Sequence, residues 1–136
     1  MRKPVILVID DDEFYRTTLS DGFSEMGFKC YTAPDGNEGF RLYGKIVPDV
    51  VVLDRIMPDS GGTRFLMSVK DQPNRKDSFL FIYSSTIKDD QARDDRESTT
   101  HQGFSRIESV SKSTAPGDLV KKVRDLMSSD QQAIRN

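Results

Sequence analysis

The sequence has few of the features that mark secreted, disulfide-stabilised or membrane proteins. A single cysteine, Cys30, excludes an internal disulfide and fits a reducing cytoplasm. No apolar run approaches the roughly 20 residues that cross a bilayer. The apolar stretch near the N-terminus is too short for a signal peptide. These absences predict a cytoplasmic protein that does not act at a membrane.

The chain also lacks a large excess of positive or negative charge. The 20 basic residues are balanced by 22 acidic ones, which leaves a net charge of −2. Without a basic excess we expect no direct contact with nucleic acid. The 136 residues are enough for one domain with one core and too few for two. We expect this domain to cover residues 1–127, with 128–136 as a polar tail or the start of a linker.

What the chain does have is an alternation of short apolar runs with stretches of helical periodicity. The predicted strands are 5–9, 28–33, 50–53, 79–83 and 107–110. The predicted helices are 12–26, one capped by Asn37, one after Gly61 and Gly62, and one over 116–127. Strands that are apolar on both faces and alternate with helices indicate an α/β fold, a doubly wound five-stranded parallel sheet with helices on both faces.

Polar residues follow these strands where each one ends. They are Asp10, Asp11 and Asp12, then Asp54, then Ser84 and Ser85, and finally Lys112. In a parallel sheet the carboxyl ends share one edge, so we expect these groups to converge. Crowded carboxylates repel one another unless a cation lies among them, and oxygen ligands without histidine or cysteine favour Mg²⁺. The set is chemically sufficient to form and hold an aspartyl phosphate.

Each of these residues alone also has an ordinary structural interpretation. The acidic run would cap a helix, and Asp54 would be a turn residue at a strand end. Ser84 would be a loop residue and Lys112 a solvated surface lysine. It is their joint placement, each on a different predicted strand, that favours the functional interpretation.

The same stretches resemble the receiver domains of response regulators over nearly the whole chain. The motifs are ILVIDDDEFYR, VVVLDRIMPDSGG, FIYSS and SKSTAPGDL, which begin at residues 6, 50, 81 and 111. The resemblance implies a flavodoxin-like fold with strand order 2-1-3-4-5. It also implies two-component signalling, in which a phosphoryl group received from another protein changes the binding of a partner.

The resemblance further implies roles for particular residues. Asp54 matches the phosphoacceptor, and Asp10 and Asp11 match the acidic pair that binds Mg²⁺, with Mn²⁺ as an alternative. Asp54 and the backbone carbonyl of Ile56 match the remaining protein ligands of the metal ion. Asp12 fits better as a helix cap than as a ligand.

Two more matches concern the response to phosphorylation. Ser84 is similar to the switch hydroxyl, and Lys112 to the lysine that pairs with the phosphoryl group. The donor implied by the resemblance is a histidine kinase or a histidine phosphotransfer protein. The single histidine of the chain, His101, has the character of a plain surface residue, so the phosphoryl group would come from another protein or from a small acyl phosphate. A downstream protein or output domain would receive the signal, and a homodimer is an open alternative.

Three departures from the family pattern stand out. Ser113 follows Lys112, where the family usually has proline, often with a cis peptide bond. Ser109 takes the position of the switching aromatic residue, for which Phe104 is a candidate substitute. Ser84 and Lys112 are 112 − 84 = 28 positions apart, more than usual, and the intervening segment 88–103 has no large apolar residue. That segment is expected to be a solvated helix or a modified partner surface.

The sequence is compatible with three classes of function to different degrees. The leading one is a phosphorylation-dependent switch, which is not an enzyme beyond the gain and loss of its own phosphoryl group. The second is a pseudo-receiver, a protein-interaction module that works without phosphorylation. The third, a phosphatase with an aspartyl intermediate, needs a cap over its substrate, and no insertion here is large or apolar enough to form one.

Overall fold

The computed structural model describes residues 3–58, 61–70, 78–85 and 104–135, with side chains up to residue 128. Five parallel strands form one sheet in the order β2-β1-β3-β4-β5. They are β1 (Val5–Ile9), β2 (Lys29–Ala33), β3 (Val50–Leu53), β4 (Phe79–Ser84) and β5 (Arg106–Ser111). This confirms the predicted flavodoxin-like fold, and the predicted strand boundaries differ from the observed ones by at most one residue.

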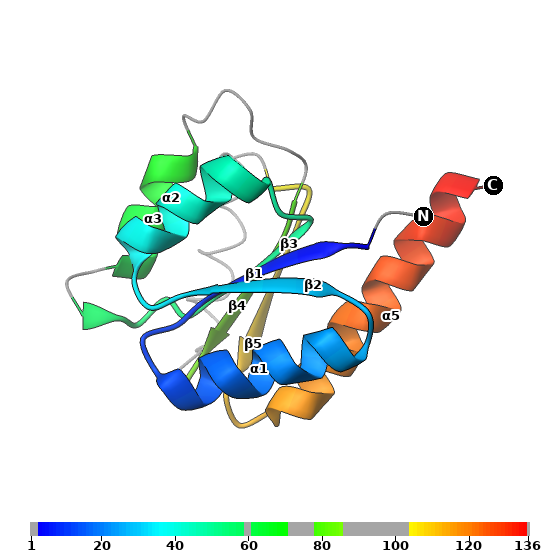
Figure 1. Ribbon diagram of the computed structural model, residues 1–136, viewed down its shortest axis with the longest axis horizontal. Helices are drawn as coiled ribbons and strands as arrows, with labels where there is room; N and C mark the ends of the chain where they lie inside the picture. Colours follow the sequence, from blue (N-terminus) through cyan, green and yellow to red (C-terminus); the bar gives the residue numbers. More distant parts are fainter. Residues whose placement is uncertain (1–2, 59–60, 71–77, 86–103, 136) are drawn as a thin grey trace.

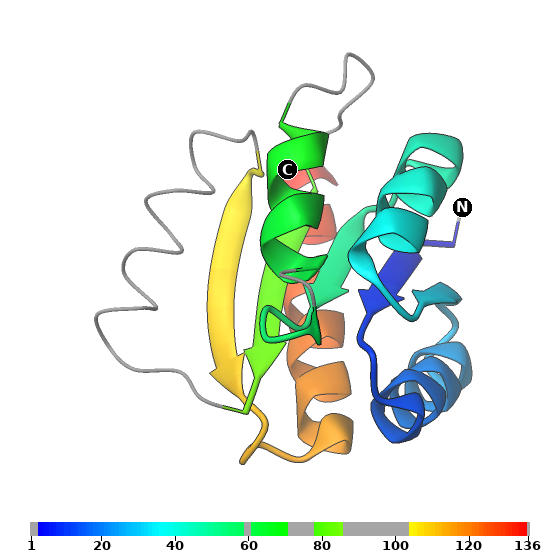
Figure 2. The same ribbon diagram turned by 90° about the vertical axis from the view of Figure 1, so that its left-hand side faces the viewer.

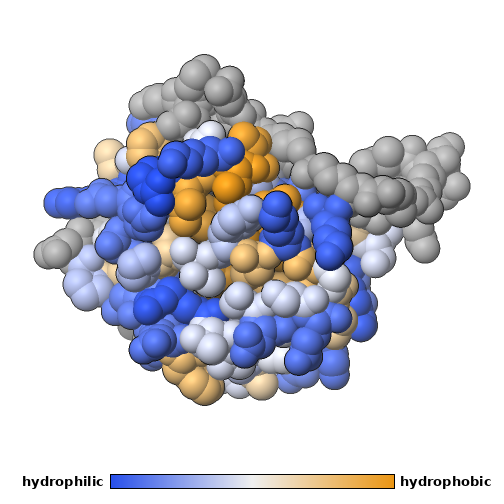
Figure 3. All heavy atoms as spheres, in the orientation of Figure 1, coloured by the Kyte–Doolittle hydropathy of each residue, from blue (hydrophilic) through white to orange (hydrophobic). Residues whose placement is uncertain are grey.

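Helices cover both faces of this sheet, as Figures 1 and 2 show. α1 (Glu13–Glu25) and α5 (Pro116–Arg135) lie on one face, and α2 (Gly36–Ile46) and α3 (Gly61–Val69) on the other. The predicted segment 88–103 lies outside the described residues. In Figure 3, hydrophobic side chains on the visible face gather over α2, while the surface over α1 is mostly hydrophilic.

The core has two layers because alternate strand residues point to opposite faces. One layer, between the sheet and α1 and α5, contains Leu19, Phe23, Tyr83, Leu119 and Val123. The other contains Tyr43, Phe65, Leu66, Ile82 and Phe104. β1, β3 and β4 lie inside the sheet and are buried almost throughout. Two-sided burial explains why these strands read as continuous apolar runs in the sequence.

Two predicted helix limits are wrong. α2 is capped by Asp35 rather than Asn37, because Asp35 has extended backbone and its Oδ1 accepts a hydrogen bond from the Glu38 N–H at 2.8 Å. α5 does not end near residue 127 but continues to Arg135, so most of the predicted polar tail has helical backbone. No glycine or proline interrupts residues 118–135, so the sequence offers no local reason to stop earlier. The division into a domain and a tail remains a prediction.

Candidate functional site

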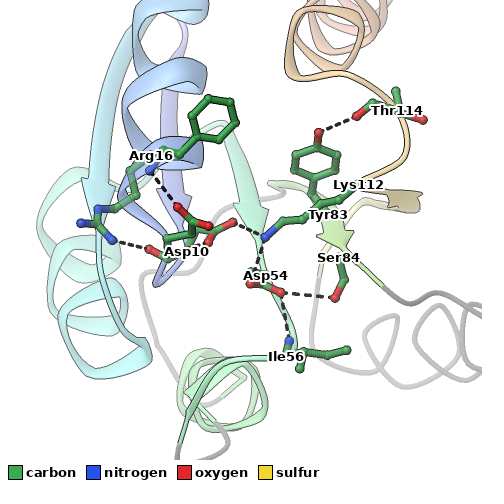
Figure 4. Close-up of polar contacts among 10 residues, drawn as sticks. Asp10, Arg16, Asp54, Ile56, Tyr83, Ser84, Lys112 and Thr114 are labelled. Atoms are coloured by element: carbon green, nitrogen blue, oxygen red, sulfur yellow. Dashed lines mark hydrogen bonds and ion pairs between the residues drawn. The ribbon is translucent and has the colours of Figure 1, made fainter.

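The predicted polar groups meet at the carboxyl edge of the sheet (Figure 4). Asp10 directly follows β1, and Asp54 directly follows β3. Ser84 is the last residue of β4, and Lys112 directly follows β5. The parallel register brings these four ends together from segments up to 102 residues apart in the chain (112 − 10 = 102). The structure therefore assembles the cluster that the strand ends predicted.

Asp54 is the centre of this cluster and is only 5% exposed. Its Oδ1 accepts hydrogen bonds from the Ile56 N–H at 3.0 Å and from the Ser84 hydroxyl at 3.2 Å. Its Oδ2 accepts one from Lys112 Nζ at 3.1 Å. Three donors from three segments thus hold this carboxylate in one orientation.

Asp10 is held in a similar way and is 2% exposed. Its Oδ1 accepts a hydrogen bond from the Asp12 N–H at 2.9 Å, and its Oδ2 lies 2.9 Å from Lys112 Nζ. The Arg16 guanidinium donates to the Asp10 backbone carbonyl at 2.9 Å. Asp12 caps α1, as predicted, because its Oδ1 accepts a hydrogen bond from the Phe14 N–H at 2.9 Å.

Acidic oxygens are close enough together here to share one cation. One carboxylate oxygen each from Asp10, Asp11 and Asp54 lies within 4.8 Å of the others, and Asp11 is exposed. The donor set is all oxygen, which suits a hard cation such as Mg²⁺. Lys112 supplies a single positive charge against three carboxylates, so a divalent cation would complete the balance. The residues present fit the metal that the sequence predicted.

The charges in the cluster also shift its pKa values. Burial raises the pKa of Asp10, and the negative charge of Asp54 adds to this, against the opposing hydrogen bonds from Lys112 and the Asp12 N–H. For Lys112, burial favours a lower pKa, but the hydrogen bond and charge of Asp10, together with Asp54, outweigh it and raise the pKa. Lys112 is therefore a permanent cation at neutral pH.

The sequence interpretation missed two aromatic residues at this site. Lys112 Nζ lies 4.1 Å from the centroid of the Tyr15 ring and 6.0 Å from that of Tyr83. From the sequence, Tyr15 was only a member of the predicted helix 12–26, and Tyr83 only the last residue of the predicted strand 79–83. The position of Tyr83 directly before Ser84 was the one available signal, because a residue next to a strand end lies near the sheet edge.

The departures from the family pattern can now be placed. No peptide bond in the described part of the chain is cis, so the loop after Lys112 is trans, and Lys112 reaches both aspartates nevertheless. Ser109 lies on β5 beside Ile82, and its buried hydroxyl has no hydrogen-bond partner among the residues that the structure describes. Phe104 is buried in the layer under α2 and α3 rather than standing on β5.

The sequence profile of the response regulator receiver domain matches residues 6–124. The chain belongs to this family. Receiver-domain relatives include the regulatory protein AtoC of Escherichia coli, 34% identical over 61% of this chain and 18% of its own length. The probable chemotaxis protein CheY of Rhizobium etli is 33% identical over 59% of this chain and 63% of its own length. The probable transcriptional regulator ycf27 of Guillardia theta is 31% identical over 92% and 46%.

Solved structures share the fold of this chain. The chemotaxis protein CheY4 of Vibrio cholerae superposes with a TM-score of 0.75 at 22% identity, covering 91% of this receiver chain and 98% of that protein. The N-terminal domain of a Wolinella succinogenes protein gives 0.72 at 26% identity, covering 97% and 99%. The matched stretch is less than two thirds of the length of each of the three relatives named above. Among the described helices of the receiver, none is both long and apolar enough to span a bilayer.

Proposed function

We propose that this receiver domain is a phosphorylation-dependent switch in which Asp54 accepts a phosphoryl group. The observation that carries the proposal is the buried Asp54 carboxylate, held by Lys112 and Ser84 beside two further acids. A carboxylate oxygen of Asp54 attacks the phosphorus atom of a phosphohistidine. The P–N bond breaks, and its electron pair returns to the imidazole of the donor protein. The product is an acyl phosphate on Asp54.

The neighbouring side chains favour this transfer through charge and hydrogen bonding. The Lys112 ammonium pairs with a phosphoryl oxygen, and the Ser84 hydroxyl donates a hydrogen bond to another. Asp10, Asp11 and the Ile56 carbonyl would hold Mg²⁺, or Mn²⁺, together with Asp54. The metal ion, when bound, supplies positive charge for the phosphoryl oxygens. The Ser84 hydroxyl then gives up its hydrogen bond to Asp54 and donates one to the phosphoryl group instead.

The partners follow from this chemistry. The donor is a histidine kinase or a histidine phosphotransfer protein, because the chain has only one histidine and receives the phosphoryl group on aspartate. The recipient of the signal is a downstream protein or an output domain, whose affinity changes when Ser84 and Lys112 turn toward the phosphoryl group. The domain is not an enzyme acting on free substrates. It turns over only its own phosphoryl group, in the cytoplasm.

The deciding experiment is intact mass after incubation with Mg²⁺ and acetyl phosphate. Wild type should gain one phosphoryl group, and Asp54→Asn should gain none. Omitting Mg²⁺ or adding a chelator should abolish the adduct. An unmodified wild type in the presence of Mg²⁺ would reject the phosphoacceptor role of Asp54.

One observation favours the pseudo-receiver as the second candidate. Ser109 has no ring that could change its burial, so the usual link between the switch hydroxyl and an aromatic side chain is missing. Partner binding and oligomer size should therefore be compared with and without a phosphoryl mimic. If both are identical although Asp54 is modified, the domain is an interaction module and not a switch.

A further inference from the structure

Lys112 contacts both Asp10 and Asp54 although its loop lacks the proline expected after it. Ser113 occupies that position, and the loop is trans. Hydrogen bonds within the loop run from the Ser113 N–H to Ser111 Oγ at 3.1 Å and from the Thr114 N–H to the Ser111 carbonyl at 2.9 Å. These contacts shape the turn, but none of them reaches the lysine side chain. The position of the ammonium therefore depends on the two carboxylates and on contacts from outside the loop.

Tyr83 connects this loop to the sheet. Its hydroxyl donates a hydrogen bond to the Thr114 carbonyl at 2.6 Å, while the backbone of the adjacent Ser84 accepts one from the Lys112 N–H at 2.8 Å. Figure 4 shows the Tyr83 ring and the Ser84 side chain pointing in different directions from β4. The end of β4 thus holds the loop at two points, on either side of Ser113.

Tyr15 acts directly on the ammonium. The 4.1 Å between Lys112 Nζ and the Tyr15 centroid is well inside the range of cation–π attraction. Tyr15 is in turn fixed by Tyr83, whose ring it meets edge to face at 5.7 Å and 84°. A single aromatic pair therefore contacts both the lysine head group and the loop that carries it.

We propose that Tyr15 and Tyr83 are positioning residues for Lys112. In the absence of a proline after the lysine, these two tyrosines fix the loop and the lysine side chain. Tyr83 sets the path of the loop through Thr114, and Tyr15 presents its ring face to the ammonium, so that Nζ remains beside Asp54. The expected consequence, faster phosphorylation of Asp54, rests on the proposed function. The placement of Lys112 itself can be tested without phosphorylation.

Packing alone does not account for these contacts. Tyr83 belongs to the buried layer under α1 and α5, and a phenylalanine there would fill the same space. Its hydroxyl adds a hydrogen bond to the one loop that carries Lys112. Burial raises the pKa of Tyr83 to about 12, so this hydroxyl keeps its proton and remains a donor at neutral pH. A structural role and a positioning role therefore predict different behaviour for Tyr83→Phe.

The first readout is the NMR spectrum of the unphosphorylated protein with labelled lysine. In wild type the Lys112 Hε protons should be shifted upfield by the ring current of Tyr15. Tyr15→Leu should abolish the shift, Tyr15→Phe should keep it, and Tyr83→Phe should reduce it. Phe14→Leu is the matched control and should keep the shift. The Phe14 ring centroid lies 5.2 Å from that of Tyr15, but Phe14 is 61% exposed. A wild-type Lys112 without an upfield shift would overturn the proposal, whether or not Asp54 is phosphorylated.

The second readout is the rate of phosphorylation by acetyl phosphate in saturating Mg²⁺. Tyr15→Leu and Tyr83→Phe should each slow it by about tenfold, the order expected for losing one interaction with a group that stabilises the transition state. Both effects should vanish in a Lys112→Ala background, because the tyrosines act through the lysine. Equal losses with and without Lys112 would show that the tyrosines only support the fold, and would overturn the proposal.

Discussion

Lys112 Nζ lies 2.9 Å from Asp10 Oδ2 and 3.1 Å from Asp54 Oδ2, so one ammonium joins two carboxylates from different strands. All three side chains are at least nine-tenths buried. Removing the ammonium would leave two buried, negatively charged groups facing each other. The stability of the domain and its affinity for a cation are therefore linked through this lysine.

Lys112→Met should lower the free energy of unfolding, by up to about 3 kcal/mol, because it leaves the buried acids unpaired. Mg²⁺ should then stabilise the variant more than it stabilises wild type, since the ion replaces the lost charge. Urea unfolding with and without Mg²⁺ measures both effects. Lys122→Met is the control: Lys122 is half exposed and pairs with Glu108 at 3.2 Å, so its loss should cost less than about 1 kcal/mol. Equal losses for both variants would contradict this account.

Mg²⁺ affinity should fall as the pH is lowered from 7 toward the raised pKa of Asp10. Burial and the charge of Asp54 make the metal-free Asp10 bind a proton more readily than its ordinary pKa of 3.8 implies, and the proton competes with the ion. Calorimetry in two buffers of different ionisation enthalpy should show more proton release on Mg²⁺ binding at pH 5 than at pH 7. Proton release that does not change over this range would show that Asp10 is already ionised at pH 5.

Gly36→Ala should destabilise the domain strongly, because α2 and α3 approach each other at this residue. A Cβ on Gly36 would lie 2.1 Å from the Gly61 carbonyl oxygen, which is backbone and cannot turn away. Gly44→Ala in the same helix is the matched control, since a Cβ there meets nothing within 4 Å. It should stabilise the domain by about 0.5–1 kcal/mol through its higher helix propensity. Thermal unfolding of the two variants should thus shift in opposite directions.

Cys30 should react slowly with Ellman's reagent in the folded protein. Burial raises the pKa of its thiol from 9.0 to about 11, and only the thiolate is a nucleophile. At pH 8 the two-unit difference makes the folded protein about 100-fold poorer in thiolate than the unfolded chain. The rate should rise with pH up to about 11, and urea should remove the protection. Since the chain has no other cysteine, the signal reports Cys30 alone.

The fold was predictable because its signals are local. β1, β3 and β4 are buried on both faces, and each therefore appears as an uninterrupted apolar run that ends at a polar residue. Periodicity located the helices but not their limits: Asp35, not Asn37, caps α2, and α5 continues to Arg135. Capping depends on the backbone conformation of a single residue, and hydrophobic periodicity carries no information about that conformation.

The members of the candidate site were also predictable, because a parallel sheet brings the ends of its strands to one edge. Asp10, Asp54, Ser84 and Lys112 could be selected from strand ends alone. Their roles in phosphoryl transfer remain predictions that the mass measurement addresses. Their mutual distances and hydrogen bonds required the fold, since each contact joins residues from different strands.

The aromatic pair illustrates the limit most clearly. Tyr15 and Tyr83 are separated by 83 − 15 = 68 positions, and although both lie inside motifs shared with the family, neither was given a role from the sequence. Their contact with Lys112 arises because Tyr15 of α1 meets Tyr83 of β4 beside the lysine that follows β5. The positions of the strands and helices follow from short-range patterns of apolar residues, and the strand order was implied by the family resemblance. The direction in which a flexible lysine points depends on packing among three distant segments, and only the folded chain brings those segments together.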